Sequence, residues 1–201
     1  MDIRNIIKSP ALVKTKFYLV LPILTGSTCR DKRYEVEDNT PPLTPPKEGD
    51  SSPLSGEVGE AEGIIRFFNE DIDFRLFSMR KIRLWLLSVI EQEQKKNGDI
   101  SCIFCSEKYL LRMNSQYLNA SYLTDVITFD YTENERISGD IFISIERVKE
   151  NAKLYKQPLQ QEILRVILHG ILHLCGYKDK KEDEIIQMRE KEDYYLGQIG
   201  F

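Results

Sequence analysis

The sequence predicts one α/β (α+β) domain, with a small mixed, mostly parallel sheet flanked by helices. From residue 63 onward, short apolar runs typical of strands alternate with longer amphipathic runs typical of helices. The chain has 201 residues, 41% of them hydrophobic, which is enough for one sizeable core. The sequence shows no internal repeat. We therefore expect a single compact domain over residues 63–201.

The residues before this domain differ from it in composition. Residues 1–38 contain one apolar run and no clear periodicity, and we interpret them as an N-terminal extension, folded or not. Residues 39–62 are rich in Pro, Ser, Gly and Glu and lack aromatic residues, which predicts a disordered linker. A misassigned translation start would also explain the extension. Native peptides from residues 1–50, found by mass spectrometry, would exclude that alternative.

The first half of the domain is predicted as strand, helix, strand and helix. Ile64 to Phe68 form a strand, and Ser78 suits the N-cap of the following helix. That helix carries apolar residues at helical spacing until Asn97 and Gly98 end the run: Ile82, Trp85, Leu86, Val89 and Ile90. Ile100 to Cys105 form the next strand, and Ser106 caps a short helix through Tyr117.

The second half is predicted as two strands and three helices. The strands are Val126 to Tyr131 and Asp140 to Ile145, with a polar loop that contains Gly139 between them. A helix from about Glu146 to Tyr155 follows. Pro158 suits the first turn of the next helix, which ends at Gly176, a residue typical of the C′ position. A highly charged helix from about Lys181 to Leu196 closes the domain.

Charge and cysteine content restrict the protein class. The formal net charge of −4 does not indicate a nucleic-acid-binding protein, although a local basic patch can still bind RNA. The four cysteines form no disulfide framework, so we expect reduced thiols and a cytoplasmic location. Cys102 and Cys105 lie three apart in a predicted strand and should face opposite ways, which favours burial over metal binding. No apolar run is long enough to span a membrane.

The two histidines of the chain, His169 and His173, predict a metal site. Residues four apart share one face of a helix, so their imidazoles can bind one ion, for which Zn²⁺ is the natural choice. A catalytic zinc site uses three protein ligands and one open position. Asp179, just beyond the helix stop, is the nearest third ligand. The alternatives are Glu182 or Asp183 as the third ligand, or two histidines with no metal and an exposed acid.

The familiar metalloprotease pattern H-E-x-x-H is not present. Its glutamate, which acts as general base, would stand at position 170, where this chain has glycine. A protease therefore lacks its base here.

The segment HGILHLCGYKD, residues 169–179, resembles the signature H-G-x-L-H-L-x-G-Y-D-H of the YbeY family of endoribonucleases. Residues 113–117, 124–129 and 139–141 resemble further family segments, and the likeness covers about residues 63–198. The resemblance implies a single α/β domain with one zinc ion per chain. It also implies single-strand-specific RNA cleavage in 16S rRNA 3′-end maturation and ribosome quality control. The implied partners are single-stranded rRNA and the small ribosomal subunit or its assembly factors.

Two residues depart from the family pattern. Asp179 stands where the motif ends in a third histidine, and a carboxylate can still complete a zinc site. Leu118 stands where the family has an arginine that handles RNA phosphate, so either another cation substitutes or the activity is weak. Arg112, Arg80 and Arg83 are the candidates for RNA binding, with Lys108 and Lys81 nearby. For each one, a solvated helix face is the alternative interpretation.

The hypothesis from the sequence is therefore a metal-dependent endoribonuclease whose catalytic centre is His169 and His173, with Asp179 as third ligand. One rival is a metal-dependent hydrolase with another substrate class. The other is a non-catalytic ribosome-assembly factor with a structural metal, to which Leu118 lends weight. The cleavage site, the native metal and the oligomeric state stay open at this point.

Overall fold

The computed structural model describes residues 16–19, 63–118 and 122–200, with residues 16–19 and Leu118 as backbone only. The predicted linker 39–62 and most of the N-terminal extension lie outside the described residues, so those predictions stay predictions.

The sheet has five strands in the order β1-β4-β5-β3-β2. Strands β2 (Ile65–Asn69), β3 (Lys96–Cys105) and β5 (Arg136–Ser144) run parallel to one another, whereas β4 (Val126–Asp130) is antiparallel to β5. Two of the three pairings after residue 63 are thus parallel, which confirms the predicted mixed, mostly parallel sheet. A short strand that the sequence did not predict, β1 (Lys16–Leu19), pairs antiparallel with the outer edge of β4.

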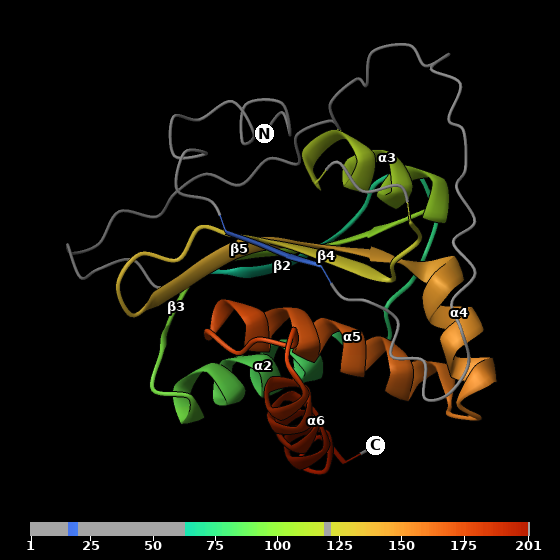
Figure 1. Ribbon diagram of the computed structural model, residues 1–201. Helices are drawn as coiled ribbons and strands as arrows, with labels where there is room; N and C mark the ends of the chain where they lie inside the picture. The colour runs from blue at the N-terminus through green and yellow to red at the C-terminus, as the bar shows by residue number, and fades with distance from the viewer. Residues whose placement is uncertain (1–15, 20–62, 119–121, 201) are drawn as a thin grey trace, which may run out of the picture.

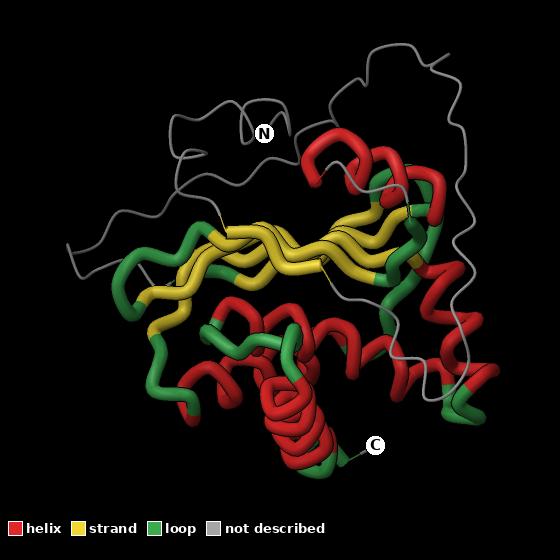
Figure 2. Tube along the Cα trace, in the orientation of Figure 1, coloured by secondary structure: helices red, strands yellow, loops and turns green. Residues whose placement is uncertain are grey.

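Helices cover both faces of the sheet (Figure 1). Helices α2 (Met79–Gln92), α5 (Leu159–Leu174) and α6 (Glu182–Leu196) lie on one face, and α3 (Glu107–Leu118) lies on the other. Helix α4 (Ile145–Leu154) follows β5 at one end of the sheet. Figure 2 shows the same layers, with α5 directly beneath the strands and α6 outside it. Helix α5 is therefore central, which places both histidines next to the core.

Two apolar clusters, one on each face of the sheet, hold these layers together. The larger cluster joins α2, α5 and α6 to the sheet and includes Cys102, and the smaller one lies under α3 and includes Cys105. Both cysteines are buried and free, so the predicted alternation of their side chains is confirmed. The five apolar residues predicted for the face of α2 are all buried, as their helical spacing required.

Two details of the predicted elements, the end of α2 and the place of Gly139, were wrong, and the N-cap at Ser78 was confirmed in position only. Helix α2 ends at Gln92 rather than at Asn97, because Gln94 adopts a left-handed backbone (φ 57°) and the chain enters β3 at Lys96. Ser78 occupies the N-cap position in a left-handed conformation and makes no capping hydrogen bond with its side chain. Gly139 lies within β5 rather than in a loop, where an added Cβ would come within 2.4 Å of the Phe129 carbonyl oxygen.

Among the helices of the described residues, none combines the length and the apolar character that crossing a bilayer requires.

Candidate metal centre

His169 and His173 lie on consecutive turns of α5, on the part of the helix that packs against β5. A Cβ at Gly170 would come within 2.6 Å of Ile141 on β5, so the absent side chain lets the helix lie close to the sheet. This packing leaves His169 5% exposed and His173 fully buried. The ring centroids are 4.4 Å apart with an interplanar angle of 86°. The predicted i, i+4 pairing of the two imidazoles is therefore present.

The end of α5 turns the chain back toward the histidines. Gly176 has a φ of 107°, which favours glycine, and its N–H donates to the His173 carbonyl. The Tyr177 N–H donates to the Leu172 carbonyl, which completes a Schellman motif. The segment that follows α5, residues 175–181, is called the Asp179 loop below. Its reversal brings Asp179 against the helix face that carries both rings.

The three side chains surround a point where an ion fits. Oδ2 of Asp179 lies 3.6 Å from Nε2 of His169 and 3.6 Å from Nε2 of His173. These separations are too long for hydrogen bonds. Atoms bound at about 2.0–2.1 Å to one tetrahedral zinc ion would lie about 3.3 Å apart. Nε2 of His169 is buried and has no hydrogen-bond partner among the described residues. A buried nitrogen in that state is unfavourable unless something binds it.

A hydrogen bond at the opposite nitrogen fixes the orientation of each ring. Nδ1 of His169 lies 2.6 Å from Oε1 of Glu192, on α6, and Nδ1 of His173 lies 2.9 Å from the Tyr177 carbonyl oxygen. Because a carbonyl oxygen only accepts, Nδ1 of His173 donates, which leaves Nε2 as the lone-pair nitrogen. Carboxylate and carbonyl partners at the second ring nitrogen are typical of metal-binding histidines.

The charges of the cluster depend on one another. Burial alone would lower the pKa of His169, but the carboxylates of Asp179 and Glu192 raise it to about 9. Burial lowers the pKa of His173, and the neighbouring His169 adds to that effect. Burial would raise the pKa of Asp179, but the two imidazoles bring it well below its usual value. Without a metal, His169 therefore carries a proton at neutral pH, and a cation that binds there replaces it.

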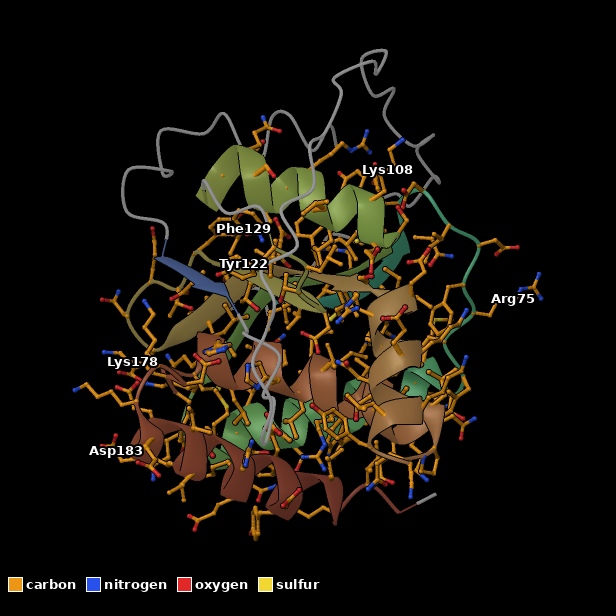
Figure 3. All side chains as sticks on the ribbon, turned by 45° about the vertical axis from the view of Figure 1, so that its right-hand side comes forward. Arg75, Lys108, Tyr122, Phe129, Lys178 and Asp183 are labelled. Carbon is orange, nitrogen blue, oxygen red and sulfur yellow. The ribbon has the colours of Figure 1, made fainter. Side chains whose placement is uncertain are left out.

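The metal cluster includes the predicted third ligand, Asp179, and neither of its alternatives. Within residues 63–118 and 122–200, the group of possible metal ligands is His169, His173 and Asp179, whose ligand atoms all lie within 4.8 Å of one another. Glu182 and Asp183, the alternative third ligands, are exposed at the start of α6, and Asp183 points outward (Figure 3). The side chain of Leu118 lies outside the described residues.

The predicted RNA-binding arginines lie apart from the metal cluster. Arg112 lies over the Tyr109 ring on α3, and the sheet separates α3 from α5. Arg83 donates from Nε to the Ile65 carbonyl oxygen at 2.8 Å, so it has a structural role. Arg80 is exposed on the first turn of α2. Their contact with RNA stays a prediction.

Glu192 is the residue of this site that the sequence reasoning missed. It is 6% exposed and its second oxygen accepts from Arg165 at 3.0 Å. A signal for it exists in the sequence. Met188, Glu192 and Tyr195 are the buried residues of α6 and stand at the i, i+4, i+7 spacing of an apolar stripe. A carboxylate in such a stripe must have a partner, and the partner here is His169.

Comparison with known proteins identifies the family of this chain. The family profile described as "Endoribonuclease YbeY" matches residues 65–200. The Endoribonuclease YbeY of Flavobacterium psychrophilum is 52% identical over 129 residues, which cover 64% of this chain and 92% of that protein. The Endoribonuclease YbeY of Cytophaga hutchinsonii is 47% identical over 137 residues, 68% of this chain and 96% of that protein.

A solved structure agrees with this assignment. The solution structure of TM1509 from Thermotoga maritima superimposes with a TM-score of 0.51 at 26% identity, covering 68% of this chain and 89% of that one. The family profile, matched over residues 65–200, spans the domain that carries the candidate metal centre and leaves out β1. From residue 65 onward, this chain belongs to the YbeY endoribonuclease family.

Proposed function

We propose that this protein is a cytoplasmic, metal-dependent endoribonuclease that cuts single-stranded RNA during maturation of the 3′ end of 16S rRNA and ribosome quality control. One observation carries the metal dependence: two imidazoles and one carboxylate converge, and the buried Nε2 of His169 has no hydrogen-bond partner among the described residues. Family membership supports the nuclease chemistry and the ribosomal substrate.

The metal that we propose is one Zn²⁺ ion held by His169, His173 and Asp179. Two nitrogens and one carboxylate oxygen suit zinc and leave a fourth position for water or substrate. When bound, such an ion supplies charge that polarises a phosphoryl oxygen or lowers the pKa of a water toward neutrality. Glu192 and the Tyr177 carbonyl keep the two rings oriented for this role.

In the proposed mechanism, the protein's own residues orient the two histidine rings and set their protonation states. Glu192 and Asp179 set the protonation state of His169, and burial keeps His173 neutral. The phosphodiester can be attacked by water or by the ribose 2′-hydroxyl. Product analysis separates the two, since a 2′,3′-cyclic phosphate end forms only by attack of the 2′-hydroxyl.

A peptidase at this site is disfavoured by the packing of α5. Position 170 would have to carry the general base of an H-E-x-x-H protease, yet even a Cβ there would collide with Ile141. This face of the helix turn has no room for a glutamate.

The experiment that tests the proposal compares the parent with His169→Ala. The parent should contain about one zinc ion per chain. It should cut single-stranded rRNA fragments, and His169→Ala should fold but lose both zinc and cleavage. A parent that binds zinc but leaves RNA intact, with a variant that no longer folds, would instead support the non-catalytic assembly factor with a structural metal.

Phosphate contacts in this proposal come from the Asp179 loop, since the family arginine is replaced at Leu118. Lys178, Lys180 and Lys181 flank the third ligand and are exposed, and Lys178 projects away from the body of the domain (Figure 3). We propose that these side chains contact RNA phosphate, because they are neighbours of Asp179 in the chain.

We expect the double variant Lys178→Gln, Lys180→Gln to weaken binding of single-stranded RNA and to flatten its salt dependence. Each lost phosphate contact should reduce the slope of log affinity against log salt by about 0.7. Lys153→Gln, at the far end of α4, is the control and should keep the parent slope. An unchanged slope in the double variant would contradict a role for these lysines. It would favour Arg112, Arg80 and Arg83 as the RNA-binding residues.

A further inference from the structure

Glu93 lies where three segments of the domain meet. It is the C-cap of α2, and its side chain is 10% exposed. Its Oε2 accepts from the Tyr177 hydroxyl at 2.8 Å, and its Oε1 accepts from Lys191 at 2.8 Å and from the Tyr195 hydroxyl. One carboxylate therefore binds the Asp179 loop and helix α6 at the same time.

The backbone of Glu93 is held in place independently of these contacts. Its N–H donates to the Val89 carbonyl, and the Lys95 N–H donates to the Ile90 carbonyl, which closes the end of α2. Burial alone would raise the pKa of Glu93, but hydrogen bonds from Lys191, Tyr195 and Tyr177 lower it, so the group is a carboxylate. Its charge faces the Lys191 ammonium, which also lies 5.5 Å from the centroid of the Tyr177 ring.

Both segments that Glu93 binds orient a histidine of the candidate metal centre. Tyr177 provides the carbonyl oxygen that accepts from His173, and it stands two residues before Asp179. On α6, Lys191 directly precedes Glu192, which is bonded to His169. The Asp179 loop runs directly into α6, and α6 lies outside α5 (Figure 1).

We propose that Glu93 is a positioning residue of the metal centre, acting through Tyr177 on His173 and Asp179 and through Lys191 and Tyr195 on the helix that carries Glu192. The inference rests on the metal site of the proposed function. It extends that site from α5 and its loop to the end of α2.

The test measures zinc affinity by chelator competition and the visible spectrum of the cobalt-substituted protein. Glu93→Gln keeps the size of the side chain but removes its charge, and its amide NH₂ replaces one acceptor with a donor. We expect zinc affinity to fall about 10-fold, the lower end of the range for groups that support metal ligands, and the cobalt spectrum to change. Glu91→Gln, an exposed carboxylate on the same helix end, should match the parent.

Folding is not expected to depend on Glu93, because the Trp85 indole N–H donates to the Tyr195 carbonyl at 3.1 Å and joins α2 to α6 separately. A Glu93→Gln variant that melts earlier but binds zinc with parent affinity and an unchanged cobalt spectrum has lost a structural clamp only, and the proposal is then wrong. If Glu93→Gln does not fold, Tyr177→Phe decides, because it removes one hydrogen bond and leaves Lys191 and Tyr195 in place.

The two proposals can fail separately. If the parent binds zinc but cuts no RNA, the proposed function is wrong. The role of Glu93 is then decided by the zinc affinity of Glu93→Gln. A parent that binds no zinc overturns the role of Glu93.

Discussion

Proton binding differs between His169 and His173, although the two rings are in contact. Two carboxylates, Asp179 and Glu192, approach His169, whereas His173 has Asp179 on one side and the Tyr177 carbonyl on the other. Their pKa values move in opposite directions for this reason. Metal binding must therefore compete with one proton, held mainly on His169.

Zinc affinity should rise with pH up to about 9, the pKa of His169 in the metal-free protein. Below that pH zinc displaces the proton, so we expect the apparent affinity to gain about 10-fold for each pH unit from 7 to 9. Chelator-competition titrations at several pH values measure this. A zinc affinity that does not change over that range would contradict the assignment of the proton to His169.

The same pKa predicts how the stability of the metal-free protein depends on pH. A raised pKa in the folded state stabilises the fold fully below the unfolded value of 6.5, and this stabilisation is lost as the pH rises through about 9. Melting temperatures of the metal-free protein should therefore fall between pH 6.5 and 9, with less change in the zinc-loaded protein.

Glu192→Gln should weaken zinc binding about 10-fold to 100-fold, the effect typical of a carboxylate behind a metal-binding histidine. The amide keeps the shape but not the charge that orients Nδ1 of His169. Asp193→Asn is the matched control, because Asp193 pairs with the same Arg165 at 3.0 Å but does not contact the histidine. Equal losses in the two variants would point to Arg165 rather than to Glu192.

At the scale of elements, the approach of α5 to the sheet decides where the metal ligands stand. The helix is buried on most of its surface, and at Gly170 it packs closely against Ile141 of β5. The sequence predicted α5 and its stop at Gly176 correctly, because helix periodicity and C-terminal glycine are local signals. The sequence prediction was wrong about the end of α2 and about Gly139, which it assigned to a loop. In both cases strand pairing with distant residues overrode the local sequence pattern.

Gly170→Ala should destabilise the protein by about 1–2 kcal/mol, since overpacking exceeds the gain in helix propensity. It should also weaken zinc binding, because the helix must move away from Ile141 with both histidines on it. Gly197→Ala is the control: its Cβ would meet no atom closer than 3.4 Å, so urea unfolding should show little change. Similar losses of stability in both variants would show that close packing at Gly170 is not the cause.

At the scale of the whole molecule, the apolar clusters and the metal ligands found among the described residues lie after residue 63. The residues described before that point are those of β1, which pairs with β4 through four residues. We propose that residues 63–201 are a self-sufficient domain and that residues 1–62 are an appendage to it.

A chain of residues 63–201 should fold and bind zinc with the affinity of the full chain. The lost β1 hydrogen bonds are worth about 1 kcal/mol each, and much of that is offset by the entropy of ordering the strand. We expect the melting temperature to change by no more than about 5 °C. Circular dichroism and zinc titration of both chains measure this, and an unfolded short chain would show that the extension belongs to the domain.

The sequence by itself determined the order of strands and helices after residue 63, the shared helix face of His169 and His173, and the turn at Gly176. Each depends on residues within a few positions of one another, where backbone geometry and periodicity act directly. Only the tertiary structure decided that Glu192 contacts His169 across 23 residues and that Glu93 contacts Tyr177 across 84. Such contacts depend on how α2, α5 and α6 pack, and no local pattern encodes that packing.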